Sequence, residues 1–177
     1  DRPKIAAWKS HPDPRIDGKL AEWGPFDGSG ADSWTELAYP ADAETGRRNS
    51  ASDLSARFSI RRTATGIAVA VDVEDNDVQN NHEGQDLYRG DLVEVYLDPQ
   101  GNNLQWGSAS DFQIGIAPVS SLPDDESDWY AWFQNGRPKQ IQAAAVRTKR
   151  GYQAELRIGW GAMGNTVPAR VGISVAV

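Results

Sequence analysis

Residues 152–160 read YQAELRIGW, a stretch that alternates strictly between apolar and polar side chains. The apolar side chains fall on one face of an extended chain: Tyr152, Ala154, Leu156, Ile158 and Trp160. The polar side chains fall on the other: Gln153, Glu155 and Arg157. A period of two indicates a β-strand with one face on a core and the other in water.

The same period recurs along the chain. It is clear in 67–74, where Ala68, Ala70, Asp72 and Glu74 form the polar or small face of a half-buried strand, and again in 92–97 and 112–117. Further strands are expected at 54–61, 140–148 and 171–177, and a single short helical turn at 160–163. The sequence therefore predicts an all-β fold, an antiparallel β-sandwich of jelly-roll-like form, with 1–177 as one domain.

Two stretches lie outside this pattern and are expected to be long loops. Residues 24–52 are small, polar and rich in Gly, Asp and Ser, and residues 119–139 combine acidic residues with aromatic ones. Loops carried by a rigid sandwich commonly hold the binding residues.

Composition narrows the possible partners. The net charge of −7 disfavours nucleic acid and anionic membranes. The absence of cysteine excludes disulfides, zinc–thiolate sites and thiol catalysis. No apolar run approaches the roughly 20 residues of a membrane span. The chain starts at Asp1 rather than Met, which fits a mature secreted protein or an excised piece of a larger one.

The stretch 72–86, DVEDNDVQNNHEGQD, supplies closely spaced oxygen ligands of the kind that Ca²⁺ prefers. The candidate metal ligands are Asp75, Asp77, Asp86 and Asp91. The match to a helix–loop–helix calcium loop is weak, since Asn80 stands where glycine is needed. A solvated Asp/Asn turn is the alternative.

Several aromatic side chains fall in expected loops, among them Tyr88, Trp129 and Trp132. Exposed flat rings suit the apolar faces of sugar rings. Packing beneath their own loop is the alternative for each.

Catalysis has little support in the sequence. Asp91 and Glu94 would face opposite sides of a sheet, unlike the paired carboxylates of a glycosidase. No catalytic triad, phosphate-binding loop or paired histidine motif is present. A haem could use His82 or Met163, but nothing else in the sequence calls for one. The sequence predicts a protein that is not an enzyme.

Three sequence segments occur in a characteristic order: PRIDGKLAEWG at 14–24, the region from ATGIAVAVDVEDNDV to QDLYRGDLVEVYLDP at 64–99, and GYQAELRIGWGAMG at 151–164. Their order and spacing resemble those of the family 9 carbohydrate-binding modules. The resemblance spans almost the whole chain. It implies a secreted, periplasmic or cell-surface module of a larger protein, with structural calcium, that binds a polysaccharide or oligosaccharide.

The resemblance also implies roles for particular residues. Tyr88, followed by Arg89, stands where such modules look to have one Trp of an aromatic clamp. Glu94 matches an acid that would bond to sugar hydroxyls, and Gln113 matches the next polar position. Trp129 and Trp132 are further candidates for ligand contact.

Departures from the family pattern leave an alternative open. Tyr88 replaces a Trp, Gln113 replaces an expected Arg, and Ala176 falls where a polar contact is expected. Similar modules also continue beyond the VGISVAV end, so either the last strand is missing or another segment closes the sheet. The alternative function is therefore a sandwich that has lost sugar binding and serves a protein partner or the cell envelope.

Overall fold

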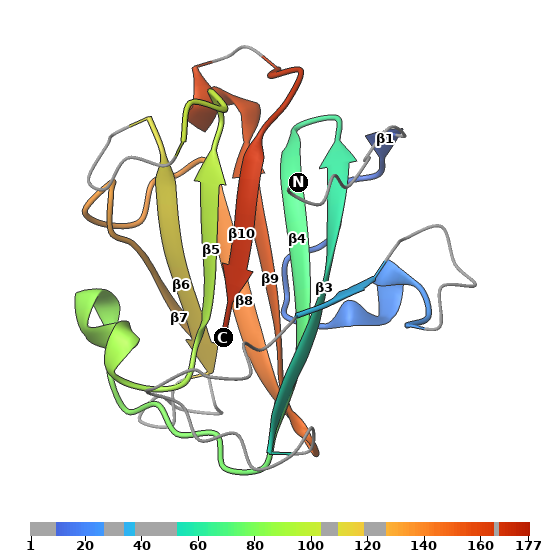
Figure 1. Cartoon of the computed structure of the whole chain (residues 1–177), viewed down its shortest axis with the longest axis vertical. Coiled ribbons are helices and arrows are strands. Elements are labelled where there is room, and N and C mark those ends of the chain that lie inside the picture. Colours follow the sequence, from blue (N-terminus) through green and yellow to red (C-terminus); the bar gives the residue numbers. More distant parts are fainter. Residues whose placement is uncertain (1–9, 27–33, 38–52, 104–109, 119–126, 165–166) are drawn as a thin grey trace.

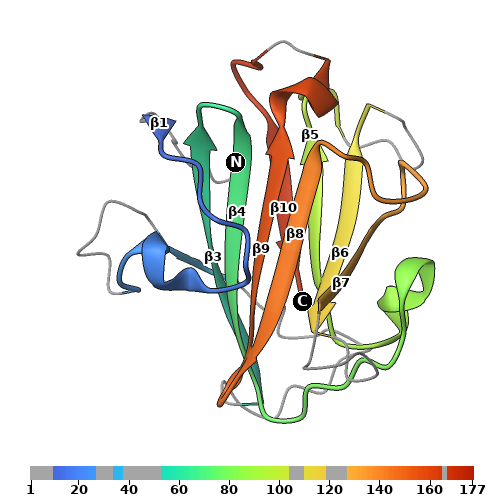
Figure 2. The ribbon, with the colours of Figure 1, turned by 180° about the vertical axis from the view of Figure 1, so that it is seen from behind.

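The computed structural model describes residues 10–26, 34–37, 53–103, 110–118, 127–164 and 167–177. Across these residues the chain forms two β-sheets packed face to face, with three short 3-10 helices and no α-helix (Figure 1). The predicted all-β sandwich is confirmed. The rear view in Figure 2 shows β8 and β9 in front of the strands of the second sheet.

Sheet A has six strands: β1 (Ser10–His11), β2 (Thr35–Glu36), β3 (Leu54–Thr63), β4 (Gly66–Asp75), β8 (Ile141–Thr148) and β9 (Gly151–Gly159). Their order is β1-β3-β4-β9-β8, with β2 also paired to β3. Sheet B has the order β10-β5-β6-β7. Its strands are β5 (Val93–Asp98), β6 (Phe112–Pro118), β7 (Ser127–Ala131) and β10 (Gly172–Ala176). Every pair is antiparallel except β1 with β3.

The main core lies between the two sheets. It is built from the alternate apolar positions of facing strands, such as Val69 and Val71 on β4, Leu156 on β9, and Val95 and Ile114 on sheet B. The sequence period identified these positions correctly because side chains on a strand alternate between its faces.

The strand β4 is not half-buried as predicted. Ala68 and Ala70 on its outer face are fully buried, because Leu20 and Trp23 of the 3-10 helix η1 (Leu20–Trp23) pack on them in a second core. Small side chains permit this close approach, and the covering segment is distant in the sequence.

Glu155 also departs from expectation, since it lies on the outer face of β9 but is 0% exposed. Its carboxylate accepts hydrogen bonds from the Trp23 indole N–H at 2.6 Å and from the backbone N–H groups of Gly18 and Asp17 at 2.8 and 3.0 Å. These hydrogen bonds hold residues 17–23 against the outer face of sheet A.

Glu155 is expected to make stability depend on pH. Burial is the main cause that raises its pKa above the ordinary value near 4.5, against the lowering effect of its hydrogen bonds. The folded protein therefore binds this proton more tightly than the unfolded chain does. This contribution is fully present below about pH 4.5 and is lost as the pH rises through the folded-state pKa. We expect urea unfolding of Glu155→Gln, compared with wild type across that range, to show a smaller loss of stability with rising pH. An identical pH dependence in the two proteins would contradict this assignment.

The expected loop 119–139 contains a strand. Residues 127–131 form β7 and pair with β6, from Ile114 opposite Ala131 to Pro118 opposite Ser127. Within the other expected loop, 24–52, the structure describes residues 24–26 and 34–37, which include the two-residue strand β2. Residues 27–33 and 38–52 lie outside the described residues.

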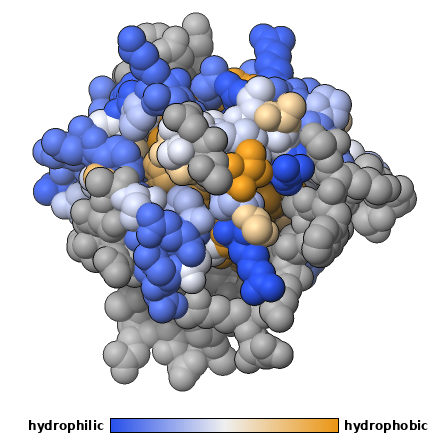
Figure 3. Space-filling model, turned by 90° about the horizontal axis from the view of Figure 1, so that it is seen from above, coloured by the Kyte–Doolittle hydropathy of each residue, from blue (hydrophilic) through white to orange (hydrophobic). Residues whose placement is uncertain are grey.

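The helical turn predicted at 160–163 is present as the 3-10 helix η4 (Trp160–Met163). Trp160, Ala162 and Met163 pack against one end of the main core. Seen from above, apolar atoms show at the centre and hydrophilic ones around them (Figure 3). No helix in the described residues is long and apolar enough to cross a membrane.

Candidate ligand-binding face on sheet B

The outer face of sheet B brings together polar side chains from neighbouring strands. Val93, Val95 and Leu97 of β5 point into the core, so Glu94 and Tyr96 point outward. The register sets Tyr96 opposite Gln113 and Glu94 opposite Gly115 on β6. Two predicted ligand contacts, Glu94 and Gln113, are therefore neighbours on one face.

These side chains form one hydrogen-bonded group. The Tyr96 hydroxyl donates to Glu94 Oε2 at 2.6 Å, and the Gln113 amide nitrogen donates to Glu94 Oε1 at 3.2 Å and to the Tyr96 oxygen at 3.3 Å. Burial, followed by the Glu94 carboxylate, raises the Tyr96 pKa, so this phenol stays a donor. The Gln113 Oε1 atom is buried and accepts no hydrogen bond within the described part of the chain. Because this oxygen is shielded from solvent, a ligand would reach it only if the Gln113 side chain moved.

Trp132 forms an apolar wall beside this group. A Cβ atom added to Gly115 would lie 2.4 Å from Trp132 Cη2, so the ring lies directly on the glycine. The Trp132 indole N–H donates to the Gln85 carbonyl at 3.0 Å, and Tyr130 packs edge-on with ring centroids 5.9 Å apart. Only glycine at 115 allows this ring to approach the sheet.

Tyr88 lies on the 3-10 helix η2 (Gly84–Arg89), which contacts β6 and β7. Leu87 is fully buried, whereas Tyr88 is 57% exposed, and Arg89 Nε donates to the Tyr88 hydroxyl at 3.4 Å. Asp128 on β7 anchors the helix, since its carboxylate accepts from the Gly84 N–H at 2.7 Å. The predicted Tyr88 and Arg89 are thus presented to solvent on the sheet B side.

Trp129 does not join this face. Trp129, on β7, lies opposite Ile116 of β6 and packs against the main core. Its neighbours Asp128 and Tyr130 occupy positions on the outer face of β7. Trp129 and Trp132 are an odd number of residues apart, and the structure assigns them to different surroundings. The outward-facing Tyr96 was missed by the sequence reasoning, although its place two residues from Glu94 on one strand could have revealed it.

Three of the four predicted metal ligands lie near one another. The Asp91 pKa is raised, first by burial and then by the charges of Asp75 and Asp77, while the Gln79 backbone hydrogen bond and the Arg147 charge lower it. Asp91 accepts the Gln79 N–H at 2.6 Å, and the Gln79 amide donates to Asp77 at 2.9 Å. Asp86 instead pairs with Arg89 at 3.3 Å. Within the described ranges, no three carboxylates or imidazoles converge as a metal site.

The fold is a β-sandwich whose outer sheet B face sets an aromatic ring beside a fixed carboxylate. A family model described as carbohydrate family 9 binding domain-like matches residues 26–177. The chain belongs to this family, as the resemblance in the sequence implied.

Two solved structures share the fold of this chain. A family 9 carbohydrate-binding module from Caldicellulosiruptor kristjanssonii in complex with cellotriose matches with a TM-score of 0.63 and 14% identity, covering 94% of this chain and 72% of the other. A structure of such a module from the same organism in complex with glucose matches with a TM-score of 0.61 and 16% identity, covering 94% and 74%. A search of curated proteins found no match.

Proposed function

We propose that the protein is a non-catalytic module that binds oligosaccharide or polysaccharide on the outer face of sheet B. The observation that carries the proposal is the group formed by Glu94, Tyr96 and Gln113 beside the Trp132 ring. A fixed carboxylate accepts hydrogen bonds from sugar hydroxyls, and Glu94 provides one on this face. The Trp132 wall and the exposed Tyr88 ring supply apolar surface for a sugar face.

Gluco-oligosaccharides are the first ligands to test, because the two solved relatives are complexes with cellotriose and glucose. The module would act outside the cytoplasm as part of a larger protein, as its family suggests. In such a protein it would hold the parent chain on its polysaccharide.

A second candidate function is a sandwich that has lost sugar binding and now contacts a protein partner. Ala176 favours it, because this residue lies opposite Glu94 on β10 and offers no polar side chain to a ligand. Fold alone does not decide between the two functions.

A binding screen against soluble glycans and insoluble polysaccharides tests the proposed function. We expect retention on a defined sugar, and we expect Tyr88→Ala to abolish that retention without lowering the melting temperature, because the ring is exposed. Arg62→Ala, an exposed residue on β3 of the other sheet, serves as the control. A folded protein that binds no glycan would shift support to the protein-partner function.

We further propose that calcium binds where Asp75, Asp77 and Asp91 lie together, with Asp86 as a predicted ligand that would have to leave Arg89. The oxygen-rich set fits the hard cation Ca²⁺, and a bound ion would offset the burial and the mutual repulsion that together raise the Asp91 pKa. The carboxylates would have to close onto the ion, since they do not converge in the described residues.

Calcium is expected to raise the melting temperature relative to a chelator. A ligand that binds only the folded state stabilises it by about 2.7 kcal/mol at 100 times its Kd. The increase should disappear in Asp75→Ala and in Asp91→Asn, but persist in Glu74→Gln, whose carboxylate pairs with Arg150. Equal melting curves with calcium and chelator would rule out a stabilising calcium site.

A further inference from the structure

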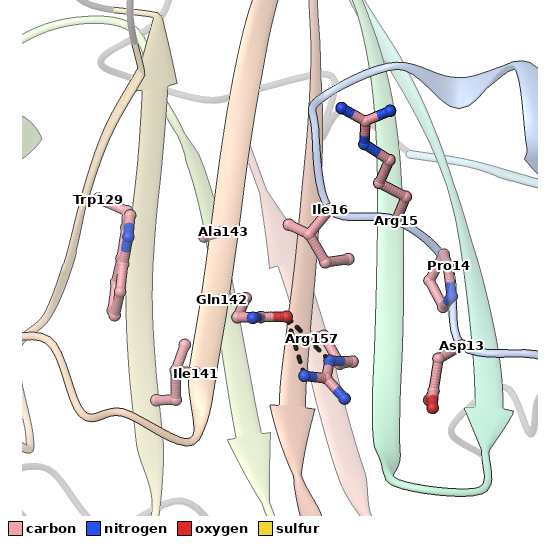
Figure 4. Close-up of a pocket in the computed structure, with 9 residues that line it drawn as sticks. All are labelled: Asp13, Pro14, Arg15, Ile16, Trp129, Ile141, Gln142, Ala143 and Arg157. Atoms are coloured by element: carbon pink, nitrogen blue, oxygen red, sulfur yellow. Dashed lines mark hydrogen bonds between the residues drawn. The ribbon is translucent and has the colours of Figure 1, made fainter.

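A trough of about 560 Å³ crosses β8, at an edge of sheet A, away from the outer face of sheet B (Figure 4). Trp129 and Ile141 stand on one side of the strand, and Arg157 and residues 13–16 on the other. The trough is open to solvent rather than enclosed, so a ligand would lie along it and keep one side in water. The proposed function on sheet B makes no use of it.

The polar part of the trough is fixed in place. Arg157 Nε and one terminal nitrogen donate to Gln142 Oε1 at 3.2 and 2.9 Å, and the other terminal nitrogen donates to the Thr65 hydroxyl. The Thr65 hydroxyl in turn donates to Asp13 at 2.7 Å. Gln142 and Arg157 therefore form a flat polar surface with a restricted geometry, visible at the centre of Figure 4.

The charge of Arg157 has no direct ion-pair partner in the described part of the chain. Its hydrogen bonds go to an amide oxygen and a hydroxyl. Asp13, which also lines the trough, is linked to it by hydrogen bonds through Thr65 and by charge attraction without a direct ion pair. A guanidinium has five N–H groups, so two remain for a ligand after these three bonds. Arginine recognises carboxylates through such paired donors.

Trp129 supplies the apolar wall. It is partly buried against the main core, and Arg137, which lies 5.9 Å from the ring centroid, is held by the buried Asp128. The ring therefore keeps its orientation beside Ile141 and Ala143. An aromatic ring on one side of β8 and a guanidinium with its amide partner on the other suit a sugar ring that lies across the strand and carries a negatively charged substituent.

We propose that this trough is a second carbohydrate site, which takes a saccharide bearing a carboxylate, that is, a uronic acid. The sugar ring lies along Trp129 and its carboxylate pairs with Arg157. The site shares no residue with the outer face of sheet B, so it binds whether or not the sheet B face does.

Cellobiouronic acid and cellobiose provide a matched pair of probes that differ by one carboxylate. We expect NMR titration of the folded protein to show cellobiouronic acid shifting the Trp129 indole N–H signal, with cellobiose leaving that signal unmoved. Arg157→Gln should weaken the effect of cellobiouronic acid at least tenfold, since hydrogen bonds to charged groups are among the stronger ones. Gln142→Ala, which frees the guanidinium from its amide support, should also weaken it. Circular dichroism verifies the fold of each variant.

Glu94→Gln and Arg62→Gln are the controls, and both should leave the Trp129 response intact. A response that disappears in Glu94→Gln but survives Arg157→Gln would place the uronate on sheet B and overturn the proposal. Equal responses to the two probes would also overturn it, as would the absence of any Trp129 shift. Loss of cellobiose binding in Glu94→Gln tests only the proposed site on sheet B. The Trp129 response tests only the trough, so the two proposals can fail independently.

Discussion

Trp23→Ala is expected to lower the free energy of unfolding by about 3–5 kcal/mol, the range for truncating a fully buried aromatic side chain. Trp23 is 0% exposed, and the Arg61 guanidinium lies 4.3 Å from its ring centroid. The substitution opens a cavity above Ala68 and Ala70 and also removes one of the three donors to the buried Glu155 carboxylate. The two losses act together because the same side chain provides both contacts.

Urea denaturation followed by circular dichroism measures this effect. Trp23→Phe keeps most of the ring but removes the indole N–H, so it separates the packing loss from the hydrogen-bond loss. Trp34→Ala is the matched control, since Trp34 is only partly buried in the same cluster. If Trp34→Ala were as destabilising as Trp23→Ala, the central place of Trp23 in this second core would be wrong.

Glu94→Gln is expected to reduce affinity for the sugar found in the screen at least tenfold, with little change in stability. The substitution keeps the shape of the side chain and an oxygen that can accept from Tyr96, but it removes the charge. Hydrogen bonds to charged groups contribute about 1.5–3 kcal/mol, which corresponds to at least a tenfold change in affinity.

Isothermal titration calorimetry on wild type and Glu94→Gln measures this change. Glu74→Gln makes the same charge change on β4, away from sheet B, and should bind as wild type does. Unchanged affinity in Glu94→Gln, with Tyr88→Ala still inactive, would move the site from the strands of sheet B to η2.

The strands that were predicted correctly are those whose core positions follow a period of two without interruption. YQAELRIGW is the clearest, and β9 covers most of it. The strand β7 was missed because Trp129 and Tyr130 sit among acidic, Gly and Pro residues that are typical of loops. Its alternation is only five residues long, too short to outweigh that composition.

Local patterns failed where a distant segment covers a face. Nothing near Glu155 in the sequence shows that residues 17–23 will bury it, since the contacting residues are separated by more than 130 positions. On sheet B, Glu94, Gln113 and Trp132 were all predicted as ligand contacts, and the structure brings them to one face. The position of Trp132 depends on contact with Gly115, which no linear pattern reveals. The proximity of Asp91 to Asp75 and Asp77 likewise follows from chain folding over 16 residues rather than from spacing.

The segment that covers the outer face of β4 affects how the module can be cut out for experiments. The family match starts at residue 26, whereas Leu20 and Trp23, which shield Ala68 and Ala70, precede it. A recombinant fragment that starts at residue 26 would expose the apolar outer face of β4 to water. It would also remove the hydrogen-bond donors of the Glu155 carboxylate at residues 17, 18 and 23. We expect a fragment whose start is chosen from the family match alone to aggregate. A recombinant fragment should therefore begin no later than Ser10, where β1 starts.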